Sequence, residues 1–525
     1  ALAWPAAAHS PVSLDPIFAG YSQTTPGCAV GVKVKDGPPA FSAYGSADLE
    51  HAVPITPDTI FEAGSVSKQF TAAAILTLVA DGKIALSDDI RKYLPEMPAY
   101  SAPITVDMLL SHTSGLRDWG EVEAVAGWPR GSRIYTHDEV LQIAARQKGL
   151  NYPPGTAYSY TNTGYNLAAM IVQRVSGQSL ADFTAQRLFK PLGMTHTGWR
   201  DDFRRIVPGR AQAYDKAGGA YVLDMPFENV HGNSSLLTTV GDLLIWNQAL
   251  TDRKLGVVAD QLQQPAVLKD GRKIDYARGL FVQTYRGARL VNHTGATAGY
   301  RAWLDRYPDQ GLSIAMLCNT GDADGVQPRK IADMYLAAPP KYDLPPLPLP
   351  GPQPATPARD LSTRPGIYIG EGALNVVRIV ADGSDLKLQG GAKLLPRADG
   401  RYNTTTSEIR FRADGVMERR TADGAVATFR RETPSTPKAE DLAQYAGTYV
   451  SDEAGASVIA SVRGGFLVLS PSDRPSEKIV LNGVFKDGFL RTGGLVRFTR
   501  DKAGKVTGLS YKGGRVWDLR FRKVG

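Results

Sequence analysis

The chain has 525 residues, of which 43% are hydrophobic and 21% charged, a composition typical of a folded globular protein. Its formal net charge of +8 comes from scattered Lys and Arg without a zinc-finger or RNA-binding signature, so we expect no nucleic-acid partner. No run of about 18 apolar residues occurs, which argues against a membrane span. The 7 histidines show no metal-ligand spacing, and we predict neither a catalytic metal nor another cofactor.

The first residues are small and apolar. They read Ala-Leu-Ala, followed by Trp-Pro and three further alanines. Ala-x-Ala is the pattern at which secretory signals are cleaved. We therefore expect a periplasmic or secreted protein whose signal peptide has been removed.

A serine and a lysine stand three residues apart at the start of an apolar helical run. Ser65 and Lys68 open a stretch that ends at Gly82, a typical helix C-cap. Residues three apart share one side of a helix, and backbone N–H groups at a helix start favour a developing oxyanion. The pair therefore predicts a serine nucleophile that needs no serine-protease histidine. Taken alone, it fits an N-cap serine and a solvated lysine better, and a second Ser-x-x-Lys at 435–438 lies in a proline-bearing link.

Tyr160 and Asn162 form the only Tyr-x-Asn in the chain, just before a predicted helix at 166–176 that stops at Gly177. A tyrosine with a pKa near ~10 is a poor base at neutral pH, but a neighbouring ammonium favours its phenolate. The pair of tyrosine and lysine is therefore able to carry the serine proton. The asparagine amide suits contact with the lysine and with a substrate carbonyl. The simpler interpretation is a packed loop tyrosine and a turn asparagine.

The tripeptide His-Thr-Gly occurs twice, at 196–198 and at 293–295, so its surroundings must decide which copy belongs to a site. The early copy follows a helix-end and loop pattern at 190–194. We interpret its histidine, His196, as structural. The late copy follows the strand-like stretch 288–292 and precedes a second predicted strand, which places it in a sheet.

The late copy supplies the third element of the predicted site. A strand edge beside a nucleophile pairs with an extended substrate and donates one oxyanion N–H. We therefore predict an oxyanion hole formed by the backbone N–H groups of Ser65 and Ala296. Substrate positioning is assigned to Asn162 and to the late tripeptide, His293, Thr294 and Gly295.

Composition changes abruptly after the first 338 residues. Residues 339–357 include nine prolines, which predicts an extended, semi-rigid linker, or alternatively a strap along the preceding domain. Beyond it, short alternating stretches are separated by Asp-Gly and Gly-Gly turns, as in antiparallel hairpins. A weak internal repeat, in which Gly-Ile-Tyr at 366–368 returns as Gly-Thr-Tyr at 447–449, predicts two small antiparallel β-barrels at 358–432 and 438–525.

The ordered motifs of the first region resemble the penicillin-recognising serine hydrolases. The relevant group contains class C β-lactamases, D-alanyl-D-alanine carboxypeptidases, D-aminopeptidases and related esterases. The phrases between the motifs, at 109–116, 191–194 and 236–246, resemble the same family. The resemblance covers residues 12–338. It implies an α/β/α sandwich with a central antiparallel sheet and an all-helical subdomain, here a catalytic domain at 1–338, and an acyl-serine intermediate hydrolysed by water.

The third motif departs from the carboxypeptidase and β-lactamase pattern, in which lysine usually precedes Thr-Gly. Lysine is a cation suited to a substrate carboxylate, whereas histidine with a reference pKa near ~6.5 is mostly neutral at pH 7. His293 therefore favours the D-aminopeptidase and esterase branches. Arg301 nearby remains an alternative source of positive charge.

A catalytic domain followed by two barrels resembles the bacterial D-aminopeptidase architecture. In that family a loop from the last barrel reaches the active site and helps to select substrates with a free amino terminus. The corresponding region here, 486–497, is a tight glycine-rich hairpin. If no long loop enters the site, a more open pocket for esters, amides or larger peptides becomes the alternative.

The resemblance also bears on the two cysteines. Cys28 and Cys318 fall on strands that are neighbours in the family's central sheet. We expect two buried thiols, with a disulfide as the alternative.

Together these features predict a serine hydrolase that acts through an acyl-enzyme on amide or ester bonds. Tyr160, tuned by Lys68, is the predicted base for Ser65, although the sequence leaves open which of the two residues takes the proton. The first expectation is a D-amino-acid-specific peptidase or amidase with a small-molecule or peptide substrate. The alternatives are a carboxylesterase, a β-lactamase or D-Ala-D-Ala carboxypeptidase, and a non-hydrolytic penicillin-binding sensor. The oligomeric state stays open.

Overall fold

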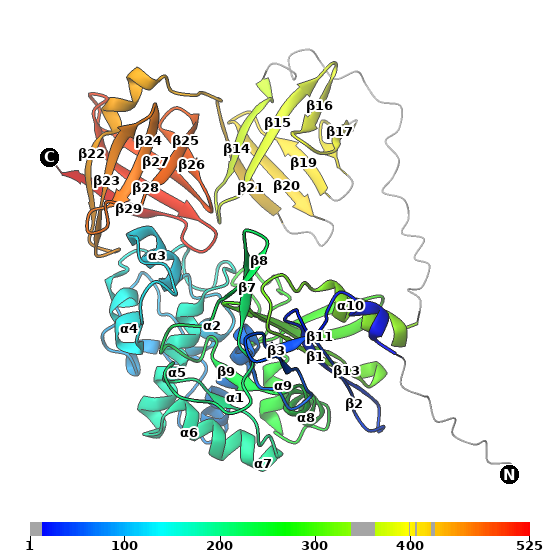
Figure 1. Ribbon diagram of the computed structural model, residues 1–525. Helices are drawn as coiled ribbons and strands as arrows, with labels where there is room; N and C mark the ends of the chain where they lie inside the picture. Colours follow the sequence, from blue (N-terminus) through cyan, green and yellow to red (C-terminus); the bar gives the residue numbers. More distant parts are fainter. Residues whose placement is uncertain (1–12, 338–362, 398, 405–406, 422–425, 525) are drawn as a thin grey trace, which may run out of the picture. The chain divides into compact units, whose positions relative to one another are not determined.

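The computed structural model describes residues 13–337, 363–397, 399–404, 407–421 and 426–524 (Figure 1). The proline-rich run at 339–357 lies outside the described residues. The described chain forms two compact units. The sheet unit comprises residues 13–116, 130–145 and 152–337, and the barrel unit comprises residues 117–129, 146–151 and those from 363 onward.

The sheet unit is built on a six-stranded antiparallel sheet with the strand order β10-β11-β12-β13-β1-β2. Its strands, in chain order, are β1 (Cys28–Val34), β2 (Ala40–Tyr44), β10 (Phe281–Tyr285), β11 (Ala288–Thr297), β12 (Tyr300–Tyr307) and β13 (Leu312–Cys318). All seven residues of β13 are buried, a pattern that requires cover on both faces of the sheet.

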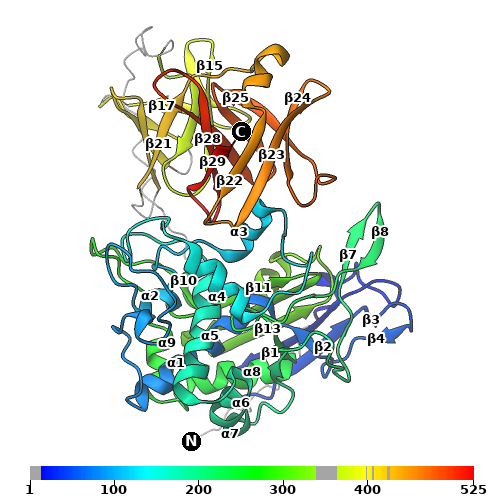
Figure 2. The ribbon, with the colours of Figure 1, turned by 90° about the vertical axis from the view of Figure 1, so that its left-hand side faces the viewer.

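Helices supply that cover. On one face, Ile331 and Ala332 of α10 (Val326–Tyr335) join the apolar core formed with Val30 and Met316. On the other face, Gly31 lies directly against Leu244 of α8 (Val240–Thr251), because successive strand residues point to opposite faces. Figures 1 and 2 show the sheet between these layers. The predicted α/β/α sandwich is therefore confirmed.

The remaining elements of the sheet unit surround this sandwich. Its further helices are α1 (Lys68–Ala80), α2 (Val106–Leu110), α4 (His137–Arg146, which ends on the first residue of a barrel-unit segment), α5 (Asn162–Ser176), α6 (Leu180–Thr184), α7 (Lys190–Leu192) and α9 (Val257–Leu262). Short helical turns are η1 (Asp15–Ile17), η2 (Gly64–Ser67), η3 (Ile90–Lys92), η4 (Ala185–Phe189) and η5 (Pro308–Gln310). Small sheets pair β3 (Ser46–Asp48) with β4 (Val53–Pro54), β7 (Tyr214–Ala217) with β8 (Ala220–Leu223), and β9 (Leu236–Thr238) with β5 (Phe61–Glu62) and β6 (Gly198–Trp199).

Cys28 and Cys318 form a disulfide, so the expectation of two buried thiols was wrong. The two residues are direct partners in the antiparallel pairing of β1 with β13, and their Cα atoms lie 4.0 Å apart. Neighbouring strands alone do not imply a bond, because a register slip of one residue turns a side chain to the opposite face. The register, which the sequence does not specify, decides the pairing.

The barrel unit contains two closed antiparallel barrels, which confirms the predicted pair of small barrels (Figure 2). Each barrel has eight strands. The first comprises β14 (Gly366–Gly370), β15 (Val376–Asp382), β16 (Asp385–Leu388), β17 (Lys393–Pro396), β18 (Tyr402–Asn403), β19 (Ser407–Phe411), β20 (Val416–Thr421) and β21 (Val426–Glu432). After η6 (Ala439–Tyr445), the second comprises β22 (Gly447–Ser451), β23 (Ala456–Arg463), β24 (Phe466–Pro471), β25 (Ile479–Phe485), β26 (Gly488–Arg491), β27 (Gly494–Arg500), β28 (Val506–Gly513) and β29 (Leu519–Val524). Among the described strands, closure leaves neither barrel with an exposed sheet edge.

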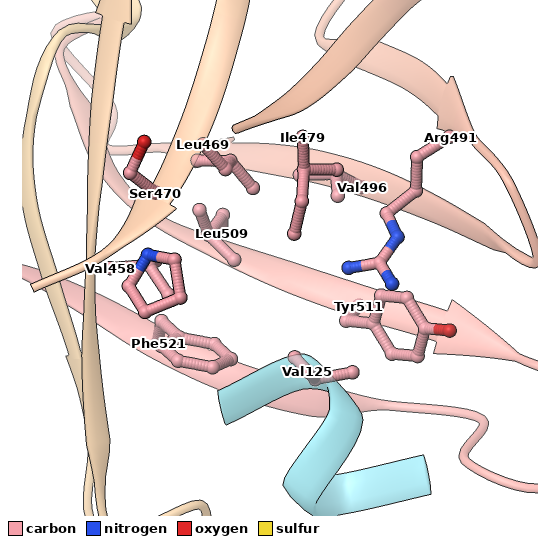
Figure 3. A pocket seen from close by; sticks show the side chains of 11 residues that line it. Val125, Val458, Leu469, Ser470, Ile479, Arg491, Val496, Leu509, Tyr511 and Phe521 are labelled. Atoms are coloured by element: carbon pink, nitrogen blue, oxygen red, sulfur yellow. The ribbon is translucent and has the colours of Figure 1, made fainter. Parts of the chain in front are cut away.

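One helix from the first third of the chain belongs to the barrel unit. Helix α3 (Trp119–Ala126) packs on the second barrel, where Val125 faces an apolar pocket that includes Leu509 and Phe521 (Figure 3). Beside it, the Glu121 carboxylate accepts hydrogen bonds from the Tyr511 hydroxyl at 3.1 Å and from a barrel backbone N–H at 2.7 Å. Burial raises the pKa of the Glu121 carboxyl. Both apolar and polar contacts therefore fix this helix to the second barrel.

The barrel hairpin at 486–497 is short. Strands β26 and β27 pair up to Arg491 and Gly494, which leaves a turn of two residues between them.

As for membrane association, none of the helices formed by the described residues combines the length and apolar character needed to cross a bilayer.

Candidate active site

Ser65 lies in the helical turn η2, directly before helix α1. A short strand, β5, delivers the chain to this turn, and the N–H of Ala63 donates to the carbonyl of Leu236 at 2.8 Å. The Ser67 hydroxyl bonds to the carbonyl of Gly64 at 2.5 Å and accepts from the backbone N–H of Leu236 at 3.1 Å. These contacts hold the serine turn at a fixed place beside α1.

Lys68 is the first residue of α1 and is completely buried. Its Nζ atom lies 2.9 Å from Ser65 Oγ, 2.9 Å from Asn162 Oδ1 and 2.7 Å from the carbonyl oxygen of Asn233. The oxygens of Asn162 and Asn233 only accept, so Nζ donates to both of them. The same nitrogen is thereby held within hydrogen-bond distance of the serine hydroxyl.

Tyr160 and Asn162 reach the same place from the start of helix α5. The Thr161 hydroxyl caps this helix by accepting from the backbone N–H of Thr163, so Asn162 occupies the first helical position. The Tyr160 ring centroid lies 4.7 Å from Lys68 Nζ, within the range of a cation–π contact. The structure thus brings the second predicted motif onto the first, although the two are 94 residues apart at Lys68 and Asn162.

The late His-Thr-Gly occupies strand β11, which lies next to the serine turn. Glycine is needed at two positions for this close approach. A Cβ on Gly295 would lie 2.0 Å from the carbonyl oxygen of Ala63 and 3.0 Å from the nitrogen of Ser65. A Cβ on Gly64, which has φ +50°, would lie 2.6 Å from the nitrogen of Ala296. The backbone amides of Ser65 and Ala296, predicted as oxyanion donors, are thereby brought together.

His293 is buried on the same strand, with 2% of its surface exposed. Its Nδ1 lies 2.6 Å from the carbonyl of Thr294, and its Nε2 lies 3.1 Å from the hydroxyl of Tyr276. Because a carbonyl only accepts, Nδ1 carries the proton and Nε2 accepts from the tyrosine. Burial, together with the charge of Lys68, lowers the pKa of His293 to about 3, so the ring is neutral at pH 7.

Comparison with known proteins decides the family. The family model described as Beta-lactamase matches residues 14–338, more than half of the chain. The chain belongs to the beta-lactamase family. It is therefore a serine hydrolase of the penicillin-recognising group, as its motif order predicted.

Individual relatives extend the likeness beyond the family region. A D-aminopeptidase of Cereibacter sphaeroides (strain ATCC 17023) is 28% identical over 450 residues, which cover 84% of this chain and 82% of the relative. Penicillin-binding protein 4* of Bacillus subtilis (strain 168) is 30% identical over 301 residues, or 53% of this chain, and the match spans 64% of that protein. Among solved structures, the chain shares its fold with the octameric penicillin-binding protein homologue from Pyrococcus abyssi, at 20% identity and a TM-score of 0.54. The match covers 95% of this chain and 96% of the homologue.

Three further residues of the candidate site were not predicted from the sequence. His112 holds the Tyr160 loop, because its Nδ1 accepts from the N–H of Thr161 at 3.2 Å and its ring lies 4.2 Å from the Tyr160 ring. Asn233 offers its carbonyl to Lys68, and Tyr276 contacts His293. His112 lies in a phrase shared with the family, which was a usable signal. A backbone carbonyl and a lone tyrosine carry no sequence signal.

Possible metal ligands gather at one place among the described residues. Asp48, Glu50 and His51 lie within reach of one another in an exposed or half-exposed turn. The imidazole of His51 already contacts the Asp48 carboxylate at 2.7 Å, which raises the pKa of the histidine. The turn is thus explained by its internal hydrogen bonds.

Proposed function

We propose that the protein hydrolyses amide bonds of D-amino-acid derivatives through an acyl-enzyme on Ser65. The observation that carries this proposal is the contact of Lys68 Nζ with both Ser65 Oγ and Asn162 Oδ1. The D-amino-acid preference is supported by the relatives named D-aminopeptidase, which match this chain from the first region into the barrels. In this chain, the neutral His293 stands where related enzymes have a lysine, which also favours substrates without a free carboxylate at that position.

The proposed acylation step gives Lys68 and Tyr160 separate roles. Lys68 is the ammonium that stabilises the Tyr160 phenolate, and Tyr160 is the proposed base for Ser65. Tyr160, as phenolate stabilised by the ammonium, takes the Ser65 proton as Oγ attacks the carbonyl carbon. The backbone N–H groups of Ser65 and Ala296 stabilise the tetrahedral oxyanion. The tyrosine proton then passes to the leaving amine as the C–N bond breaks.

Deacylation runs the same proton path in reverse order. Water donates a proton to Tyr160 as its oxygen attacks the acyl carbon, and the proton returns to Ser65 Oγ when the ester bond breaks. Asn162 holds Lys68 in place and presents its amide to the substrate carbonyl.

Export to an oxidising compartment belongs to the same proposal and is supported by the disulfide between Cys28 and Cys318.

The decisive experiment is steady-state hydrolysis of four chromogenic substrates by the wild type and by Ser65→Ala. They are D-alanine p-nitroanilide, its L-isomer, p-nitrophenyl butyrate and nitrocefin. Preferential turnover of the D-anilide that disappears in Ser65→Ala supports the proposal. Ester turnover without anilide turnover would move the protein to the esterase branch, and release of one product per site would make it a sensor that stays acylated.

The assignment of the base has its own test. Tyr160→Phe removes the proposed base and should abolish acylation at all pH values below the lysine pKa. Lys68→Met removes the charge that stabilises the phenolate, so its residual activity should rise with pH toward the ordinary tyrosine pKa of ~10. An active Tyr160→Phe variant beside a dead Lys68→Met variant would instead assign the base to Lys68.

A further inference from the structure

A pocket of about 380 Å³ opens in the sheet unit beside the oxyanion strand. It begins at Ala296, whose N–H is the second proposed oxyanion donor, and continues along the turn that joins β11 to β12. A second part of the lining comes from residues 224–228, which follow strand β8. A group attached to the acyl carbon of a substrate therefore has a ready-made cavity next to the reacting carbonyl.

The charged side chains of this pocket differ in their ion-pair and hydrogen-bond partners. Glu228 is buried and forms an ion pair with Arg130, with Nε and Oε2 3.0 Å apart. Arg301 Nη1 donates to the backbone carbonyls of Ala298 at 2.7 Å and Tyr300 at 2.8 Å. The Asp224 carboxylate, in contrast, has neither an ion pair nor a hydrogen bond with any residue that the structure describes.

The backbone of Asp224 is hydrogen-bonded to the turn that follows the oxyanion strand. Its N–H donates to the carbonyl of Ala213 at 2.8 Å, and its carbonyl accepts from the N–H of Gly299 at 2.9 Å. Gly299 sits in the β11–β12 turn so close to Tyr214 that a Cβ would lie 2.4 Å from the Tyr214 carbonyl oxygen. The carboxylate is thus attached to a backbone segment that is hydrogen-bonded to the turn directly after the strand that carries Ala296.

The surroundings of Asp224 favour a cation. Burial raises the pKa of this carboxyl, the negative charge of Asp215 adds to the effect, and Arg301 opposes it. Next to the carboxylate, Met225 and Phe227 provide apolar surface on the same wall. A ligand with a positive group beside an apolar group would satisfy both features.

We propose that Asp224 binds a protonated amine on the acyl half of the substrate, while Met225 and Phe227 contact the apolar group next to that amine. This inference rests on the proposed acyl-enzyme function of Ser65, because the pocket is defined relative to its oxyanion strand. The amine is either the α-ammonium of an amino-acyl group or a side-chain ammonium. Asp224 is a specificity residue and takes no part in proton transfer.

The first test measures protection and requires no turnover. Ser65 is labelled with a fluorophosphonate in the presence of D-phenylalaninamide, N-acetyl-D-phenylalaninamide or N-acetyl-D-lysinamide. In the wild type, an amine-bearing amide should slow labelling at concentrations at least 10-fold lower than the N-acetyl phenylalanine amide, as expected for a charge-assisted hydrogen bond. The phenylalanine and lysine amides distinguish the α-ammonium from the side-chain ammonium.

Variants then assign the effect to one carboxylate. Asp224→Asn should raise the protecting concentration of the effective amine about 10- to 100-fold and leave that of the N-acetyl phenylalanine amide within about twofold. Asp224→Glu, which keeps the charge, should retain part of the preference. Asp58→Asn is the matched control, because Asp58 is an exposed acid of the sheet unit that does not line the pocket. The labelling rate without amide reports whether each variant keeps its active site.

The outcomes separate this inference from the proposed function. Equal protection by amine and N-acetyl amides in the wild type, or an unchanged preference in Asp224→Asn, would overturn the role of Asp224. Absence of anilide hydrolysis with a preserved, Asp224-dependent amine preference would overturn the D-amidase proposal alone. A loss of labelling in Asp224→Asn without amide transfers the test to Asp224→Glu, where an amine preference lost despite normal labelling counts against the proposal.

Discussion

The two His-Thr-Gly segments of the sheet unit have the same sequence and opposite surroundings. In the early segment, the His196 side chain is 53% exposed and its backbone N–H donates to Asp242 at 2.8 Å. In the late segment, His293 is buried against Tyr276 and its strand lies next to the serine turn. His196 and Thr197 of the early copy therefore contact Asp242 at the start of helix α8, whereas the late copy lies at the proposed active site.

The glycines differ most sharply. A methyl group on Gly295 would overlap the backbone before Ser65, whereas a Cβ on Gly198 meets nothing within 4 Å. Identical residue types are thus constrained at one copy and free at the other. The comparison predicts paired variants whose effects should differ in kind, because the late copy acts on the reaction and the early copy on stability.

The largest difference is expected for the glycine pair. Gly295→Ala should lower kcat about 100- to 1,000-fold, because displacing the backbone near Ser65 and Ala296 removes oxyanion stabilisation. Gly198→Ala should leave kcat within about twofold. Initial rates and fluorophosphonate labelling measure both. Equal activity of the two variants would show that strand β11 does not form the oxyanion hole.

The next effect concerns stability and the early copy. The Thr197 hydroxyl donates to the buried Asp242 carboxylate at 2.7 Å and contacts Thr238 at 2.8 Å. Thr197→Val should lower the free energy of unfolding by about 1–3 kcal/mol, because it removes a hydrogen bond to a buried charge. Chemical denaturation checks this value, and kcat should stay unchanged. Thr294→Val, at an exposed strand position, is the matched control and should cost little stability.

The pH dependence of stability provides the third comparison. His293 has a pKa lowered to about 3, and an unfolded histidine has a pKa near ~6.5, so the unfolded chain binds more protons between these values. Its contribution to stability is present above about pH 6.5 and is lost as the pH falls, by up to about 1.4 kcal/mol per pH unit. His293→Gln should therefore flatten the decline of unfolding free energy between pH 6.5 and 4.5. His196→Gln serves as the comparator, and an equally steep decline in both variants would contradict the prediction.

The smallest expected effect is on the rate. His293→Gln loses the hydrogen bond with Tyr276, which is worth about 1 kcal/mol and should lower kcat/KM about fivefold. His196→Gln should have no measurable effect on kcat/KM. Because His293 stays neutral above about pH 5, its replacement should also leave the pH profile of kcat/KM between pH 6 and 9 unshifted. A shift of the acidic limb would show that His293 titrates during catalysis.

Much of the local structure was predictable because it depends on neighbouring residues. The three-residue spacing of Ser65 and Lys68 and the apolar run behind them predicted the start of α1. Alternation and glycine turns predicted strands such as β15 and β19 and, through the repeat, two barrels. No local pattern predicts that α3, which precedes the barrels by more than 200 residues, packs on the second one.

The sequence alone determined which residue types belong together, because motif order and helix spacing are properties of the chain. Only the tertiary structure decided what each of them contacts. The register of β1 with β13 joins the two cysteines, and a backbone carbonyl 165 residues away accepts a hydrogen bond from Lys68. His293 is buried beside Tyr276 whereas His196 is exposed, and this difference in burial distinguishes the two histidines. These contacts depend on how close segments far apart in the chain come in the fold and on how well the surrounding protein excludes water. A local pattern of residues encodes neither of these two properties.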